Sequence, residues 1–101
     1  MFFYSIDDNR ILLSKPSAEV YIRLQRIEKR TATIAYSANP ARDTKLTSAE
    51  ILWGDGSSIQ NKPLSIGPQS HSYEDDGKYT IKVDVFAGDV LCGSDSMEIS
   101  L

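Results

Sequence analysis

Residues 71–85 read HSYEDDGKYTIKVDV, and no other part of the chain is as informative about its structure. From Tyr79 onward, apolar and polar residues alternate, which is the period-two pattern of a strand with one buried face. The Asp76-Gly77 pair immediately before this strand predicts a tight turn, because glycine reaches positive φ without a steric clash. We therefore expect a long strand over residues 78–86 that is entered through a tight turn.

A second turn lies upstream, at Gly54-Asp55-Gly56, and it follows the apolar run 49–53. The apolar run predicts another strand that ends at this turn. The connection over residues 57–69 contains two prolines and a glycine, so we expect a long loop with a short edge strand near residues 58–60. The middle of the chain is therefore a strand, a Gly-Asp-Gly turn, a long connection and a second strand.

The rest of the chain also predicts short strands separated by turns. We expect strands over residues 18–26, 31–38, 90–92 and 95–101, a charged turn at 28–30, a loop over 39–47, a turn at Gly88-Asp89 and a break at Gly93. The residues expected to face the core are Val20, Ile22, Leu24, Ala32, Ile34, Tyr36, Ala38, Met97, Ile99 and Leu101. About seven short strands with no helical periodicity predict an all-β sandwich.

The two turns and the strands beside them resemble the PKD domain, an immunoglobulin-like β-sandwich. That family shows an aromatic-Gly-Asp-Gly turn and then, after a loop, His-x-Tyr-x-x-x-Gly-x-Tyr-x-Val-x-Val. The matching residues here are Trp53, Gly54, Asp55, Gly56, His71, Tyr73, Gly77, Tyr79, Ile81, Val83 and Val85. The resemblance covers residues 18–101 and implies an immunoglobulin-like sandwich of antiparallel strands. Family members usually carry a core tryptophan where this chain has Ile51, which implies a core anchored on Trp53 instead.

Residues 1–17 are additional to the family pattern and form a separate N-terminal element before the sandwich at 18–101. Two apolar runs flank Asp7-Asp8-Asn9, which has good turn chemistry, so we expect a β-hairpin or an arm followed by a linker. The apolar side chains expected to dock on a partner are Phe2, Phe3, Tyr4, Ile6, Ile11, Leu12 and Leu13. Two interpretations stay open: the element packs on its own sandwich, or it docks on another chain by strand addition or by filling a groove.

Composition excludes several classes of function. The net charge of −3 comes without a clustered basic face, so we expect no nucleic-acid partner. No stretch is long enough to span a membrane, and the N-terminus lacks the basic region of a signal peptide. If Met1 is the true start, we expect synthesis in a cytoplasm without the usual export. A single cysteine cannot form an internal disulfide, so the fold does not depend on an oxidising compartment.

Few residues are candidates for chemistry. Asp55 could contribute to a calcium site with Asp75, Asp76 or Asp43, but no dense run of alternating aspartates supports one, and we interpret Asp55 as fixing the turn. His71 and Cys92 are the only candidates for a base and a nucleophile, which would need to lie within hydrogen-bond reach. We instead expect His71 to bond a neighbouring loop and Cys92 to be a small buried hydrophobe. The sequence therefore predicts no catalytic residue, cofactor or metal.

Two further groups have both a binding and a structural interpretation. Tyr73 and Tyr79 could be exposed binding aromatics, but we favour structural roles, with Tyr79 on the core face and a hydroxyl tying down a loop. A basic group in the first half could meet an acidic partner, although acidic neighbours favour an ordinary solvated face. The members of this basic group are Arg23, Arg26, Lys29, Arg30, Arg42 and Lys45.

We therefore predict a non-enzymatic structural or interaction protein. The specific hypothesis is a bacteriophage virion component, a capsid decoration or tail-associated protein that docks on capsid or tail subunits, or on itself, through its N-terminal arm. Its loops over residues 39–47 and 57–69 could touch host sugars weakly. The alternative is an adhesion or carbohydrate-associated PKD module of a larger secreted or cell-surface protein. The two differ in localisation, which is the virion for the first and the cell surface or exterior for the second.

Overall fold

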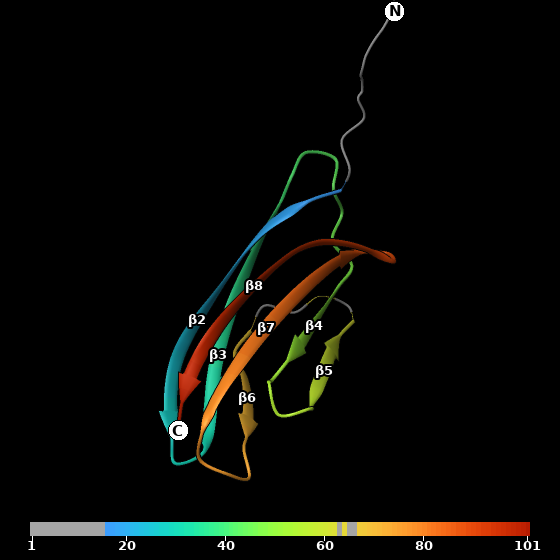
Figure 1. Cartoon of the computed structure of the whole chain (residues 1–101). Coiled ribbons are helices and arrows are strands. Elements are labelled where there is room, and N and C mark those ends of the chain that lie inside the picture. Colours follow the sequence, from blue (N-terminus) through green and yellow to red (C-terminus); the bar gives the residue numbers. More distant parts are fainter. Residues whose placement is uncertain (1–15, 63, 65–66) are drawn as a thin grey trace, which may run out of the picture.

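The computed structural model describes residues 16–62, 64 and 67–101, and these residues form strands and connecting loops. Seven strands build two antiparallel sheets (Figure 1). Their bounds are β2 Ala18–Glu28, β3 Thr31–Pro40, β4 Ser48–Leu52, β5 Ser58–Asn61, β6 Gln69–Ser72, β7 Lys78–Ala87 and β8 Val90–Ser100. The described residues contain no helix long and apolar enough to cross a membrane.

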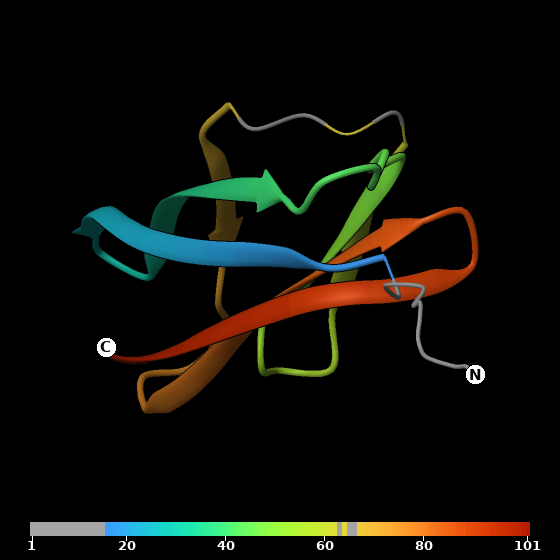
Figure 2. The same cartoon turned by 90° about the horizontal axis from the view of Figure 1, so that it is seen from above.

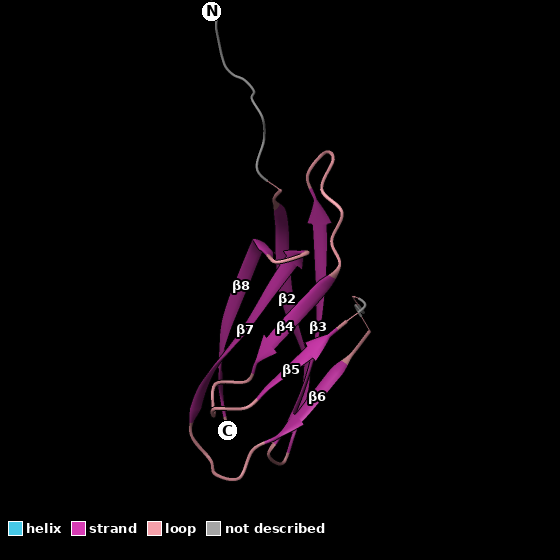
Figure 3. Ribbon diagram, turned by 90° about the vertical axis from the view of Figure 1, so that its right-hand side faces the viewer, coloured by secondary structure: helices cyan, strands magenta, loops and turns pink. Residues whose placement is uncertain are grey.

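The smaller sheet has the strand order β2-β3-β6, and the larger has the order β5-β4-β7-β8. The two sheets face each other as the layers of a sandwich, with β5 and β6 on one side of it and β2 and β8 on the other (Figures 1 and 3). The strand predicted from residue 78 is β7, which pairs with β4 on one side and β8 on the other. It is therefore one of the two inner strands of the larger sheet, the other being β4.

The core lies between the sheets and follows the alternation of the sequence. Ile51, Ile81 and Val83 are fully buried, and Trp53 is 3% exposed. Ile51 thus fills the position where a tryptophan was expected from the family pattern, and Trp53 is the large aromatic of the core. The buried hydrophobic residues of the described chain are Val20, Ala32, Ile34, Tyr36, Ala49, Ile51, Trp53, Tyr73, Ile81, Val83, Val85, Cys92 and Ile99.

The side of the sandwich formed by β2 and β8 is closed by specific contacts. The two strands run side by side in Figure 2, in blue and red. The Ile22 amide of β2 donates to Asp95 Oδ2 of β8 at 2.8 Å. Close by, a Cβ placed on Gly93 would lie 2.2 Å from the carbonyl oxygen of Ala18. Only glycine lets the two backbones approach this closely.

Two predicted boundaries were wrong. Gly93 does not break the last strand, because β8 runs from Val90 to Ser100 and Gly93 pairs with Val85. A shift of register beside that pair absorbs one extra residue, which allows the strand to continue. The loop predicted over residues 39–47 starts later, because β3 extends to Pro40, which pairs with Ala18 at the edge of the ladder. The predicted N-terminal hairpin lies outside the described residues.

Candidate functional site

The Gly-Asp-Gly turn joins β4 to β5 and is held from two directions. Asp55 Oδ1 accepts the Ser57 amide at 2.9 Å, and the Trp53 amide donates to the Ser57 carbonyl at 3.0 Å. Gly54 has φ of +92°, and a Cβ there would lie 2.5 Å from the Thr80 carbonyl oxygen of β7. The turn therefore needs glycine at this position for both its backbone angle and its contact with β7.

Asp55 also connects the turn to β6. Its Oδ2 lies 2.8 Å from Nε2 of His71, and both side chains are about one-fifth exposed, at 22% and 20%. The hydrogen bond from His71, helped by the Ser57 amide, lowers the pKa of Asp55 to about 2, although partial burial opposes this shift. The pair ties the larger sheet to the smaller one, since the turn belongs to the former and His71 to the latter.

Aromatic rings surround His71. The Trp53 ring stacks on the imidazole with centroids 5.0 Å apart and planes 14° apart. Tyr73 meets the imidazole edge-on at 4.7 Å, and the Tyr73 ring lies 4.3 Å from that of Tyr79. The motif residues of the sequence thus form one continuous row of rings, a geometry that adds to the burial of their apolar surface.

Both tyrosine hydroxyls of this row donate to backbone carbonyls. The buried Tyr73 hydroxyl donates to Trp53 at 2.8 Å, and the Tyr79 hydroxyl donates to Asp75 at 2.7 Å. Burial, with smaller contributions from Asp55 and Tyr79, raises the pKa of Tyr73 to about 12. These hydroxyls tie the turn and the β6–β7 loop to the strands, which is the structural role expected for them.

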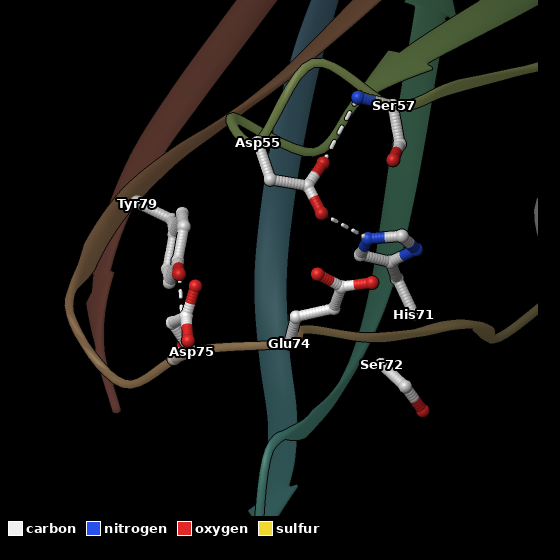
Figure 4. A pocket seen from close by; sticks show the side chains of 7 residues that line it. All are labelled: Asp55, Ser57, His71, Ser72, Glu74, Asp75 and Tyr79. Atoms are coloured by element: carbon white, nitrogen blue, oxygen red, sulfur yellow. Dashed lines mark hydrogen bonds and ion pairs between the residues drawn. The ribbon is translucent and has the colours of Figure 1, made fainter.

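Polar side chains around the Asp55–His71 pair line an open pocket of about 370 Å³ (Figure 4). It lies between the β4–β5 turn and the β6–β7 loop, and Asp55 and His71 point toward each other across it. Its lining residues are Asp55, Ser57, His71, Ser72, Glu74, Asp75 and Tyr79. The three carboxylates of this lining make the pocket acidic.

Cys92, the candidate nucleophile, is not among the residues that line the pocket with His71. His71 Nε2 bonds a carboxylate, and no hydrogen bond joins His71 to a serine or to Cys92 among the described residues. Cys92 lies on β8, is only 9% exposed, and directs its thiol to the Val90 carbonyl at 3.4 Å. The two candidates for a base and a nucleophile therefore do not form a pair.

The calcium candidates are brought together only in part, and Asp76 is not among the residues that line the pocket. Asp55 and Asp75 line the same pocket, whereas Asp43 lies in the loop after β3, toward the opposite end of the sandwich. Within the described ranges, no group of three or more histidine, cysteine, aspartate or glutamate side chains is placed to hold a metal ion. Calcium takes six to eight oxygen ligands, and two of the candidate carboxylates share this pocket.

The basic residues of the first half are distributed over a strand, a turn and a loop. Arg23 and Arg26 lie on β2 and Lys29 and Arg30 in the turn that follows, while Arg42 and Lys45 lie in the loop after β3. Arg26 pairs with Glu28 at 3.8 Å, and both side chains are exposed. The basic residues of the first half therefore do not form one continuous basic face.

Two structurally important residues carry no clear signal in the sequence. Asp95 caps the Ile22 amide across the sandwich, a contact that depends on which strands meet in space. Ile59 lies on the short strand β5 and is 45% exposed, although it pairs with the fully buried Ile51. The apolar docking residues predicted at positions 2–13 lie outside the described part of the chain.

Comparison with known proteins identifies the fold. The crystal structure of the PKD1 domain from the Vibrio cholerae metalloprotease PrtV is similar to this chain, with a TM-score of 0.69. The match covers 84% of this chain and 96% of that domain at 14% sequence identity. No family model matches the sequence, and no curated protein matches it. The predicted PKD-type, immunoglobulin-like sandwich is therefore confirmed at the level of the fold.

Proposed function

We propose that this chain is a non-catalytic interaction module, a PKD-like sandwich that attaches to a partner protein through its N-terminal segment. The observation that carries the proposal is the use of the motif residues. Asp55, His71, Tyr73 and Tyr79 are all engaged in hydrogen bonds that hold turns and loops to the sandwich. The chemically versatile side chains thus serve the fold, which leaves binding as the function that best fits the chain.

The specific role that we propose is that of a bacteriophage virion component. Small immunoglobulin-like domains with an added attachment segment resemble the decoration and auxiliary proteins of tailed-phage capsids and tails. In this role the sandwich is displayed on the particle, and the apolar residues between Phe2 and Leu13 attach it to capsid or tail subunits. Binding to the assembled particle would stabilise the assembled state by mass action.

The proposal is tested by co-sedimentation of the purified chain with tailed-phage particles from the same source. The full chain is compared with a chain that lacks residues 1–15 and with a triple variant in which Phe2, Phe3 and Tyr4 become serine. Replacement of Ser5 and Ser14 by alanine is the matched control in the same segment. We expect binding by the full chain and the control, and loss of binding by the other two while circular dichroism shows an unchanged fold. Equal binding by all four proteins would contradict the role of the segment.

A second candidate function is an adhesion or carbohydrate-associated module of a larger secreted or cell-surface protein. It is favoured by the likeness in fold to a PKD domain of a metalloprotease. For this function the binding surface is the loops rather than the N-terminal segment. A glycan array and a cell-binding assay would then give a signal that survives removal of residues 1–15 and is lost when the loop over residues 41–47 is replaced by glycine and serine.

A further inference from the structure

The strand edges on the two sides of the sandwich differ in how their backbone groups are protected. On one side, the Asp95 carboxylate of β8 accepts a hydrogen bond from the Ile22 amide of β2. A side chain therefore satisfies this amide at the edge of β2. On the other side, β5 pairs only with β4 within the described residues. Natural edge strands are usually protected by lysine, proline, a bulge or an inward charge. The β5 sequence Ser58-Ile59-Gln60-Asn61 has none of these four, and the shortness of the strand is the usual protection that it does have.

The hydrogen bonding of the β4–β5 hairpin determines which backbone groups of β5 are free. The Trp53 amide donates to the Ser57 carbonyl, so Leu52 and Ser58, the next opposed pair, do not exchange hydrogen bonds. Because the pattern alternates, Ile59 bonds to β4, whereas the amides and carbonyls of Ser58 and Gln60 point away from the sheet. The outer edge of β5 therefore offers two donors and two acceptors to another strand.

An apolar side chain accompanies this edge. Ile59 is opposite Ile51 on the core-facing side of the sheet, yet 45% of its surface is exposed whereas Ile51 is fully buried. Almost half of the Ile59 surface is therefore left exposed by the described residues. The other open edge, β6, is different, because its core-facing His71 is already held by Asp55 and Trp53.

We propose that β5 is a self-association edge, at which two copies of this chain pair β5 with β5 in antiparallel orientation. The two-fold axis passes at Ile59, so that Ser58 of each copy exchanges hydrogen bonds with Gln60 of the other and the two Ile59 side chains meet. The two larger sheets become one continuous sheet. The proposal stands independently of the attachment segment, because it uses only described residues of the sandwich.

Charge supports a second copy as the occupant. The four residues of β5 are uncharged, and opposite charges flank the strand, with Asp55 before it and the exposed Lys62 after it. In antiparallel pairing about Ile59, Lys62 of one copy faces the Gly54-Asp55-Gly56 turn of the other. Parallel pairing would place like charges together at both ends, so the antiparallel arrangement is the complementary one.

The association is expected to be weak in solution. Paired strands of four residues bury less than the roughly 1,000 Å² that a stable interface needs. Sedimentation velocity of the full chain over about 10 μM to 1 mM covers the range expected for an interface of this size. We expect the mean mass to rise with concentration from 11.2 kDa toward twice that value. A mass that stays at the monomer value throughout would overturn the proposal.

Substitutions at the two-fold axis give the decisive test. Ile59→Lys and Ile59→Asp each place like charges against each other, so each variant should remain monomeric, whereas an equimolar mixture should associate again. A structural role of Ile59 alone would not produce this recovery. Association of Ile59→Lys equal to that of the natural chain, or a mixture that stays monomeric, would contradict the pairing. Association that depends only on residues 1–15 would do so as well.

Proline substitutions test the backbone pairing with matched controls. Gln60→Pro removes an outward-facing amide of β5, which an edge strand tolerates, and should abolish association. Gln60→Ala keeps that amide and should associate normally. Ser70→Pro makes the same kind of change on the other open edge, β6, and should also leave association intact. If Ser70→Pro and Gln60→Pro had equal effects, pairing through β5 would be ruled out.

Discussion

Gly54 is the residue at which a single added methyl group should cost most. Its φ of +92° disfavours any side chain, and the added Cβ would lie 2.5 Å from the Thr80 carbonyl oxygen. We expect Gly54→Ala to lower the free energy of unfolding by about 3 kcal/mol, since a clash with backbone adds to the strain of positive φ. Urea denaturation followed by Trp53 fluorescence measures the change.

Gly56 provides the matched control for this prediction. It has nearly the same backbone angle, φ of +93°, but no atom lies within 4 Å of its added Cβ. Gly56→Ala should therefore cost only about 1 kcal/mol, which is the strain of positive φ alone. Equal effects at the two glycines would mean that β7 can move away from the turn.

Asp55 should make the stability of the fold depend on acidic pH. Its pKa is about 2 in the folded chain against 3.8 for the free side chain, mainly because His71 donates a hydrogen bond to it. A lowered pKa contributes stability that is complete above pH 3.8 and is lost as the pH falls through 2. The contribution should be about 1 kcal/mol or less, because solvent reaches the pair.

This prediction is checked by thermal unfolding between pH 5 and pH 2. Asp55→Asn should be less stable than the natural chain at pH 5, and the difference should shrink toward pH 2. His71→Gln should reduce the same pH dependence, since it replaces the partner. A difference between Asp55→Asn and the natural chain that stays constant over this range would contradict the role of the charge.

At the level of single residues, the sequence predicted which side chains have structural roles, but it did not predict the contacts between residues far apart in the chain. The role of Asp55 in fixing its turn agrees with the bond to the Ser57 amide, a contact over two residues that turn chemistry anticipates. The bond between Asp55 and His71 spans sixteen residues and two sheets. Its existence depends on how the sheets pack, which no local pattern encodes.

At the level of the strands, a single side chain, that of Asp95, joins β8 to β2 by a hydrogen bond. Asp95→Ala would leave the Ile22 amide without its acceptor, at a cost of about 1–2 kcal/mol in the free energy of unfolding. Asp95→Asn keeps an acceptor oxygen and should lose less. Native-state hydrogen exchange provides the specific measurement, because the Ile22 amide should exchange faster in Asp95→Ala. Unchanged protection of that amide would show that β2 is held in place by other contacts.

The errors in the predicted strands have a common physical cause. Gly93 was interpreted as a breaker because glycine weakens a strand that is considered alone. In the fold it lies where the Ala18 carbonyl comes closest to β8, so its lack of a side chain permits the contact between β2 and β8. Propensity and periodicity predict which side chains of a strand face the core and which face solvent. They do not predict the edge contacts of β8, which depend on tertiary structure.

For the whole molecule, alternation and turn residues were sufficient for the fold class. The strands found were close to those expected, and the likeness to a PKD domain agrees with the predicted sandwich. The partner could not be predicted in the same way. Binding depends on surface shape and on exposed strand edges. A short edge strand was predicted near residues 58–60, but the sequence does not show which backbone groups of that strand face outward.

Cys92 reports whether the sandwich opens as one unit. Its thiol is 9% exposed on β8, facing the core, so a thiol reagent reaches it only when β8 separates from its neighbours. We expect labelling of the native chain to be more than about 100-fold slower than that of a free thiol, and to accelerate in urea in step with global unfolding.

The control is Leu91→Cys in a Cys92→Ala background, because position 91 is 51% exposed on the same strand. That variant should react almost as fast as a free thiol in the native state. If Cys92 instead reacted as fast as the exposed Leu91→Cys control without urea, β8 would open locally. The contact between β2 and β8 would then be a weak point of the fold rather than part of one cooperative core.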